Sequence, residues 1–172
     1  MCTTTLLFTY GTLKVGYWNH DIYCRSARSV EEATARGRLY ELPPGIPILQ
    51  VPEDDILAVG TRDILADVDV QEQQAAILTS QRWEPSESSD VVYGELLTFD
   101  DPLLRIPPID RLEGFRPGQP SLYRRVLTPV FTKDGIVAAW VYVTDSLQCL
   151  RSCRRLENGR WEHESYLLDG HD

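Results

Sequence analysis

The chain alternates short apolar runs with polar segments rich in turn-forming residues, and this pattern predicts a β-rich fold. The runs are rich in β-branched and aromatic residues, which favour strands. Residues 136–144 are apolar on both faces, which indicates a central strand, whereas Pro47 restricts its strand to a sheet edge. The clearest hairpin turns at Lys133-Asp134-Gly135, because Asp-Gly is a strong turn signal. The predicted strands cover residues 6–8, 34–42, 46–51, 91–99, 122–131 and 136–144.

Three or four short helices are predicted beside these strands. Asp69 is the expected cap of one helix. A second helix is expected to start at Asp101-Pro102, to break near the prolines at 107 and 108, and to end at Gly114 in a left-handed conformation. The predicted helices cover residues 21–29, 70–81, 102–112 and 146–156.

These elements define an α+β protein. Because the strands are apolar on both faces, we expect the sheet to curl into a small β-barrel with short helices packed against it. A length of 172 residues suits a single domain over residues 1–172. The residues after 157 are expected to form a loose C-terminal tail, pinned in part by Trp161 and Tyr166.

The charge balance narrows the range of partners. The chain has 17 Lys and Arg against 26 Asp and Glu, a net charge of -9, which repels phosphate backbones and argues against nucleic acid. No apolar run approaches the ~20 residues of a membrane helix, and the N-terminus does not resemble a signal peptide, so we expect a cytoplasmic protein with no membrane partner. The oligomeric state stays open.

The cysteines and histidines predict no metal site and no cofactor. Cys149 and Cys153 are four residues apart and share a face of a predicted helix, where they are interpreted as small buried residues. The other two cysteines are Cys2 and Cys24, and the three histidines do not fall at zinc-binding spacings.

Two motifs stand out as candidate chemistry. The first apolar strand stops at Tyr10-Gly11-Thr12-Leu13, where Gly11 allows a sharp turn whose successive N–H groups could bind an anion. A plain turn is the alternative interpretation. The second motif is Asp110-Arg111-Leu112-Glu113-Gly114-Phe115, far downstream, and Tyr123-Arg124-Arg125 follows it.

The order and spacing of these motifs resemble the gamma-glutamylcyclotransferase-like, or AIG2-like, family. The resemblance implies a small mixed β-barrel with flanking helices. It also implies cyclisation of a small-molecule γ-glutamyl substrate to 5-oxoproline, with release of an amine or amino acid. Residues 53–90 are longer and more acidic than the corresponding connection in compact family members, which indicates an insertion. The resemblance is carried by residues 8–14 with Asn19 and His20, 93–95, 110–115, 123–125 and 138–143.

The resemblance implies a role for each motif residue. Glu113 corresponds to the general acid/base, and a single carboxyl group with a raised pKa suits that task. Tyr123 would line the pocket, and the turn that holds the glutamyl group comprises Tyr10, Gly11, Thr12 and Leu13.

Several structural alternatives stay open at this stage. Glu113 could be an ordinary glutamate paired with an arginine, and both tyrosines could belong to the core. Asp110 could cap its helix or orient the pocket. Arg125 could neutralise a substrate carboxylate or form a cross-strand ion pair. The corresponding alternative function is a non-catalytic small-molecule or partner-binding module that keeps the pocket.

Overall fold

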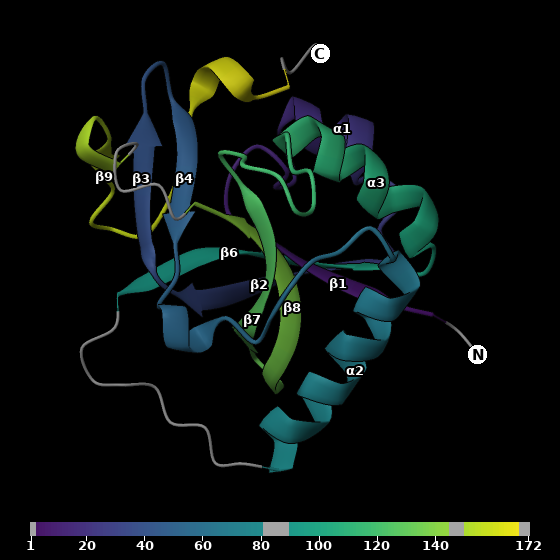
Figure 1. The fold of residues 1–172 in the computed structure, drawn as a ribbon. Coiled ribbons are helices and arrows are strands. Elements are labelled where there is room, and N and C mark those ends of the chain that lie inside the picture. The colour runs from purple at the N-terminus through teal and green to yellow at the C-terminus, as the bar shows by residue number, and fades with distance from the viewer. Residues whose placement is uncertain (1–2, 81–89, 145–149, 169–172) are drawn as a thin grey trace.

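The computed structural model describes residues 3–80, 90–144 and 150–168 (Figure 1). Figure 1 shows the three α-helices on one side of a curled sheet and the β3–β4 hairpin on the other. The elements are β1 (Thr5–Thr9), α1 (Trp18–Tyr23), β2 (Ser29–Arg36), β3 (Arg38–Leu42), β4 (Ile46–Gln50), the 3-10 helix η1 (Glu53–Asp55), β5 (Ala58–Val59), α2 (Ile64–Ser80), β6 (Val91–Phe99), α3 (Pro102–Glu113), β7 (Arg124–Thr132), β8 (Gly135–Val143), β9 (Arg154–Arg155) and the 3-10 helix η2 (Glu164–Tyr166).

Five strands close into a barrel in the order β2-β6-β1-β8-β7. The closure is made by β2 and β7, where Thr34 pairs with Phe131 and Ala35 with Val130. Strand β1 is antiparallel to β6 and parallel to β8, so the barrel is mixed. The predicted α+β fold, a small mixed β-barrel with short flanking helices in a single domain, is confirmed.

Alternate side chains of the barrel strands enter two separate buried clusters. The inner faces of the barrel strands form one cluster, which includes Phe8, Leu96 and Val141. The outer faces contribute Leu127 and Trp140, which pack together with residues from the helices. Strand β8 lies between β1 and β7, and its alternate side chains enter both clusters. It is therefore apolar on both faces, as the sequence predicts.

The predicted single strand over residues 34–42 is wrong, because the chain changes sheets at Gly37. Strand β2 belongs to the barrel, and β3 is the central strand of a second sheet in the order β4-β3-β9. Strand β4 is an edge strand of this sheet, as Pro47 predicts.

The helix boundaries differ from the predictions at three places. Helix α1 does not cover residues 21–29, since the chain from Ser29 onward pairs with β6. Helix α2 starts six residues before residue 70, and Asp63 caps it by accepting the N–H of Ala66 at 3.1 Å, instead of Asp69. Residues 154–155 form β9, so the helix predicted over 146–156 does not extend that far; residues 145–149, including Cys149, lie outside the described residues.

Helix α3 runs without a break from Pro102 to Glu113, so the predicted interruption at residues 107–108 is wrong. The carbonyls that these prolines leave without a helical partner belong to Leu103 and Leu104, whose side chains are exposed. Gly114 ends the helix at φ +69°, the predicted left-handed conformation. No helix in the described ranges is long and apolar enough to span a bilayer, and the cytoplasmic location stays a prediction.

Gly94 marks the tightest contact inside the barrel. A Cβ atom at Gly94 would lie 2.1 Å from the carbonyl oxygen of Thr9 and 2.9 Å from the ring of Phe8. We expect Gly94→Ala to lower the free energy of unfolding by about 2–3 kcal/mol in urea titration, because strand β1 must shift to admit the methyl group. Val91→Ala, at a half-exposed position of the same strand, is expected to cost less than about 1 kcal/mol. Equal costs for the two variants would contradict this account of the contact.

Candidate functional site

The turn after β1 is closed by the N–H of Lys14, which donates to the carbonyl of Gly11 at 3.1 Å. Within the described chain, the N–H groups of Gly11, Thr12 and Leu13 donate to no other backbone group. Gly11 packs directly on Pro47 of β4, where a Cβ atom would lie 2.4 Å from the proline ring. The turn therefore offers unused donors next to a wall that only glycine can approach so closely.

Helix α1 holds the turn from the side. The side-chain amide of Asn19 donates to the hydroxyl of Thr12 at 2.9 Å. The ring of His20 bonds the carbonyl of Leu13 through Nδ1 at 2.8 Å, which requires the tautomer that carries its proton on Nδ1. Neither residue was among the predicted site residues, although both follow the turn within eight positions and are polar.

Glu113 is the last residue of α3, and its side chain is partly buried. Burial, and secondly the negative charge of Asp110, raise the pKa of Glu113 to about 7. The charge of Glu113 in turn contributes to the raised pKa values of Tyr10 and Tyr142, after the larger effect of burial in each case. Glu113 therefore interacts electrostatically with Tyr10, at the start of the turn. Among the described residues, no arginine forms a salt bridge with Glu113, so the ion-pair alternative gains no support.

Tyr123 and the turn both contact Pro47. The buried hydroxyl of Tyr123 donates to the carbonyl of Pro47 at 2.6 Å, and its proximity contributes to the raised pKa of Tyr10, again after burial. The structure thus brings Gly11 and Tyr123 together around Pro47, and Tyr10 interacts electrostatically with both Tyr123 and Glu113. Leu13 is buried with Tyr123 in the outer cluster.

Arg125 on β7 forms a buried ion-pair cluster behind this region. Its guanidinium donates to Asp67 of α2 at 2.9 Å and to Asp110 of α3 at 2.9 and 3.2 Å, and its side chain is 1% exposed. It also donates to the carbonyl of Thr61 at 3.0 Å. The predicted cross-strand ion pair is therefore wrong, because the carboxylate partners of Arg125 lie on two helices. The alternative, neutralisation of a substrate carboxylate, gains no support from a side chain that is so deeply buried.

Asp110 connects this cluster to the turn. The hydroxyl of Tyr142 donates to Asp110 at 2.6 Å, and the carbonyl of Tyr142 accepts the hydroxyl of Tyr10 at 2.6 Å. Tyr142 was not among the predicted site residues, although it lies in the 138–143 strand that carries the family resemblance, because it stands in a run of apolar residues. Asp67 could not be predicted either, because it belongs to an acidic segment whose composition is typical of an ordinary solvated surface.

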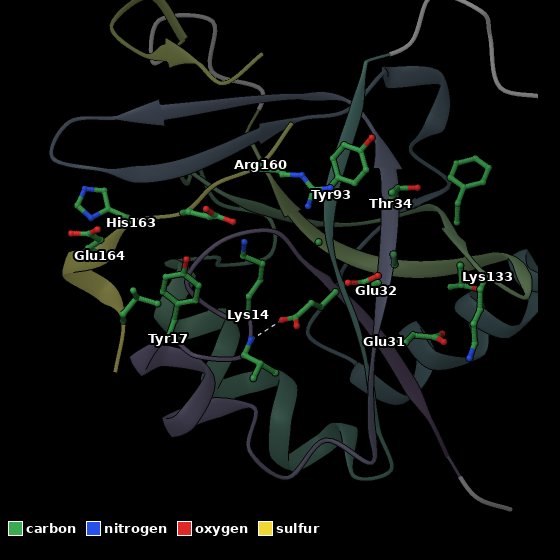
Figure 2. Close-up of a pocket in the computed structure, with 18 residues that line it drawn as sticks. Lys14, Tyr17, Glu31, Glu32, Thr34, Tyr93, Lys133, Arg160, His163 and Glu164 are labelled. Atoms are coloured by element: carbon green, nitrogen blue, oxygen red, sulfur yellow. Dashed lines mark hydrogen bonds between the residues drawn. The ribbon is translucent and has the colours of Figure 1, made fainter. Parts of the chain in front are cut away.

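A separate groove of about 1260 Å³ lies on the outer surface of β2 and β6 (Figure 2). Figure 2 shows Lys14 and Tyr17 on one wall, with Glu32 and Tyr93 on the strands. Neither Glu113 nor Tyr123 lines this groove. Lys14 is the link between the two places, since it follows the turn directly and its ammonium group donates to the carbonyl of Trp161 at 2.7 Å.

The described ranges contain no group of three His, Cys, Asp or Glu side chains placed to hold a metal ion. The groups found in this region are a carboxyl group with a pKa near neutrality, phenolic hydroxyls and backbone N–H groups.

Comparison with known proteins places the chain in a family. Residues 7–76 and 62–163 match the family model described as gamma-glutamyl cyclotransferase, AIG2-like. The chain belongs to this AIG2-like family. No curated protein matches the sequence.

Two solved structures share the fold of this AIG2-like protein. An AIG2-like protein from Mus musculus is 19% identical with a TM-score of 0.54, over 94% of this chain and 90% of the mouse chain. YkqA from Bacillus subtilis is 21% identical with a TM-score of 0.53, over 92% of this chain. The chain spans 39% of the length of YkqA. At these identities the likeness concerns the fold alone.

Removing the charge of Arg125 tests the buried cluster. We expect Arg125→Met to lower the free energy of unfolding by about 3–5 kcal/mol in urea titration, because two buried carboxylates lose their partner. Arg28→Met breaks the exposed ion pair between Arg28 and Asp100, which are 2.7 Å apart, and is expected to cost less than about 1 kcal/mol. If both variants cost the same small amount, the cluster does not hold the helices as described.

Proposed function

We propose that this AIG2-like protein cyclises a γ-glutamyl group to 5-oxoproline and releases an amine or amino acid. The observation that supports the proposal most directly concerns Glu113: it is a partly buried carboxyl at the end of α3, with a pKa raised to about 7, and it interacts electrostatically with Tyr10 at the start of the turn. Membership of the family supports the same reaction class. We further propose that the substrate is a small molecule, that no cofactor is needed and that the protein is cytoplasmic.

The reaction needs one proton carrier and no external reactant. The α-nitrogen of the γ-glutamyl group attacks its own γ-carbonyl carbon, which forms the ring C–N bond. The amide C–N bond to the leaving amine then breaks. Glu113 as a carboxylate accepts the proton lost by the attacking nitrogen, and as a carboxylic acid it returns this proton to the leaving nitrogen. The carboxyl group ends in its initial state, so the step is balanced.

Holding the substrate in a folded conformation supplies much of the acceleration. Both reacting groups belong to one molecule, and correct orientation of such a pair contributes up to about 7–11 kcal/mol in favourable cases. We propose that the N–H groups of Gly11, Thr12 and Leu13 bind the substrate carboxylate or the oxyanion that develops on the γ-carbonyl. Tyr10 and Tyr123 would flank the glutamyl chain.

The proposed base makes activity depend on pH. We expect kcat/KM to fall as the pH drops below about 7, because Glu113 of the free enzyme is then protonated and cannot accept a proton. The α-ammonium of the substrate, with a pKa of about 8, must also lose a proton before the nitrogen can attack. Its deprotonation adds a second rise in kcat/KM at higher pH. Rates of 5-oxoproline release from about pH 5 to pH 9 separate the two limbs, and a profile with only the substrate limb contradicts the role of Glu113.

Replacing the carboxyl group separates chemistry from folding. We expect Glu113→Gln to abolish 5-oxoproline release from γ-glutamyl amines and dipeptides. The same variant should be more stable than the parent above pH 7, by at most about 3 kcal/mol, because ionised Glu113 is poorly solvated in the fold. The difference should shrink as the pH falls from 7 to 4.5 and vanish below 4.5, where the parent carboxyl is protonated in both the folded and the unfolded state.

Glu72→Gln is the matched control, since it makes the same change at an exposed position of α2. This control should leave both activity and the pH dependence of stability in place. An active Glu113→Gln would remove the proposed mechanism. Thermal stabilisation by γ-glutamyl compounds without any turnover would instead favour the alternative of a binding module.

A further inference from the structure

We propose that Asp110 is the positioning residue of this site: its carboxylate, held by Arg125 and Tyr142, fixes the last turn of α3, and with it Glu113, against the barrel. The inference rests on the proposed function, because positioning has meaning only for a group that carries protons. It assigns a role to Asp110, for which the sequence alone allowed either a helix cap or a residue that orients the pocket. Asp110 in fact lies eight residues after the start of α3, so it caps nothing at that end.

The first step of the argument is the way Asp110 is held. Both carboxylate oxygens accept hydrogen bonds from Arg125, at 2.9 and 3.2 Å, and one of them also accepts the hydroxyl of Tyr142 at 2.6 Å. Arg125 and Tyr142 face each other across neighbouring strands β7 and β8. A carboxylate held by two strands at once has little freedom, because charge-assisted bonds are short and directional.

The second step is the connection from Asp110 to Glu113. The two residues are three positions apart on α3, so they lie on the same face of its last turn. The carbonyl of Asp110 also accepts the N–H of Phe115 at 2.8 Å, which folds the chain after Glu113 back onto the helix. The chain on the C-terminal side of Glu113 is thus bonded back to Asp110, so a displacement of Asp110 is expected to displace Glu113 as well.

The third step is the connection from Asp110 to Tyr10, at the start of the turn. Tyr142 holds Asp110 through its hydroxyl and holds Tyr10 through its carbonyl, both at 2.6 Å. One residue of β8 therefore bonds both the helix that carries Glu113 and the residue that begins the turn. The separation between the proton carrier and the proposed substrate turn is set by this short path.

Charge acts along the same path. Among the described residues, the ionisable groups that interact electrostatically with Glu113 include Asp110 on its own helix, Tyr10 before the turn, Tyr142 on β8 and Cys24 after α1. Asp110 is the one group whose negative charge raises the pKa of Glu113, in addition to burial.

The test compares two carboxylates that share one arginine. Asp110→Asn and Asp67→Asn each remove one of the two acidic partners of Arg125, so both are expected to destabilise the fold to a comparable extent. Only Asp110→Asn should lower the pKa of Glu113, measured by NMR titration of 13C-labelled glutamate carboxyl groups. It should also move the acid limb of kcat/KM to lower pH and reduce kcat by up to about 100-fold, with a smaller change in KM.

Tyr142→Phe covers the case in which Asp110→Asn does not fold. This variant keeps the ring in the core and removes only the hydroxyl bond to Asp110, so it should fold and still lose kcat well below its unfolding temperature. Rates that match the parent in folded Asp110→Asn or Tyr142→Phe overturn the inference, as does an equal pKa change in Asp67→Asn. A parent protein that releases no 5-oxoproline refutes the proposed function, whereas the NMR titration reports separately on the path from Asp110 to Glu113.

Discussion

The positive charge of Arg125 has to be balanced inside the layer between the barrel and its helices. Water does not reach the guanidinium, so Asp67 and Asp110 must supply the counter-charges from two different helices. The faces of Trp140 and Phe115, 5.0 and 5.6 Å from the guanidinium carbon, complete its surroundings. This requirement fixes where α2 and α3 lie, because neither helix can slide without leaving an unpaired buried charge.

The region around Glu113 gains its chemical character from the same requirement. A carboxyl group held in a partly buried position beside a second carboxylate is costly to ionise, and the fold tolerates the cost because α3 is secured elsewhere. Stability and reactivity are therefore unequally distributed along one helix. Its middle is bonded to the barrel through Asp110, and its last residue is left with a proton affinity near neutrality.

Sequence patterns were sufficient for the barrel and for the two motifs, but insufficient for the contacts between them. The strands follow from local alternation, and the turn at Asp134-Gly135 from local turn chemistry. The division at Gly37 could not be read locally, because which sheet a strand joins is decided by distant partners. The bonds from Tyr142 to Asp110 and from Arg125 to Asp67 could not be predicted for the same physical reason, since each joins residues more than thirty positions apart.

The attachment of Lys14 to Trp161 has a consequence for how the molecule is made. Trp161 is fully buried, its indole donates to the carbonyl of Gly45 at 3.1 Å, and its own carbonyl holds the ammonium group of Lys14. The loop after the first strand therefore reaches its final shape only when residue 161 is in place. During vectorial synthesis on the ribosome, this loop therefore waits for a residue 147 positions further along the chain before its last bond forms.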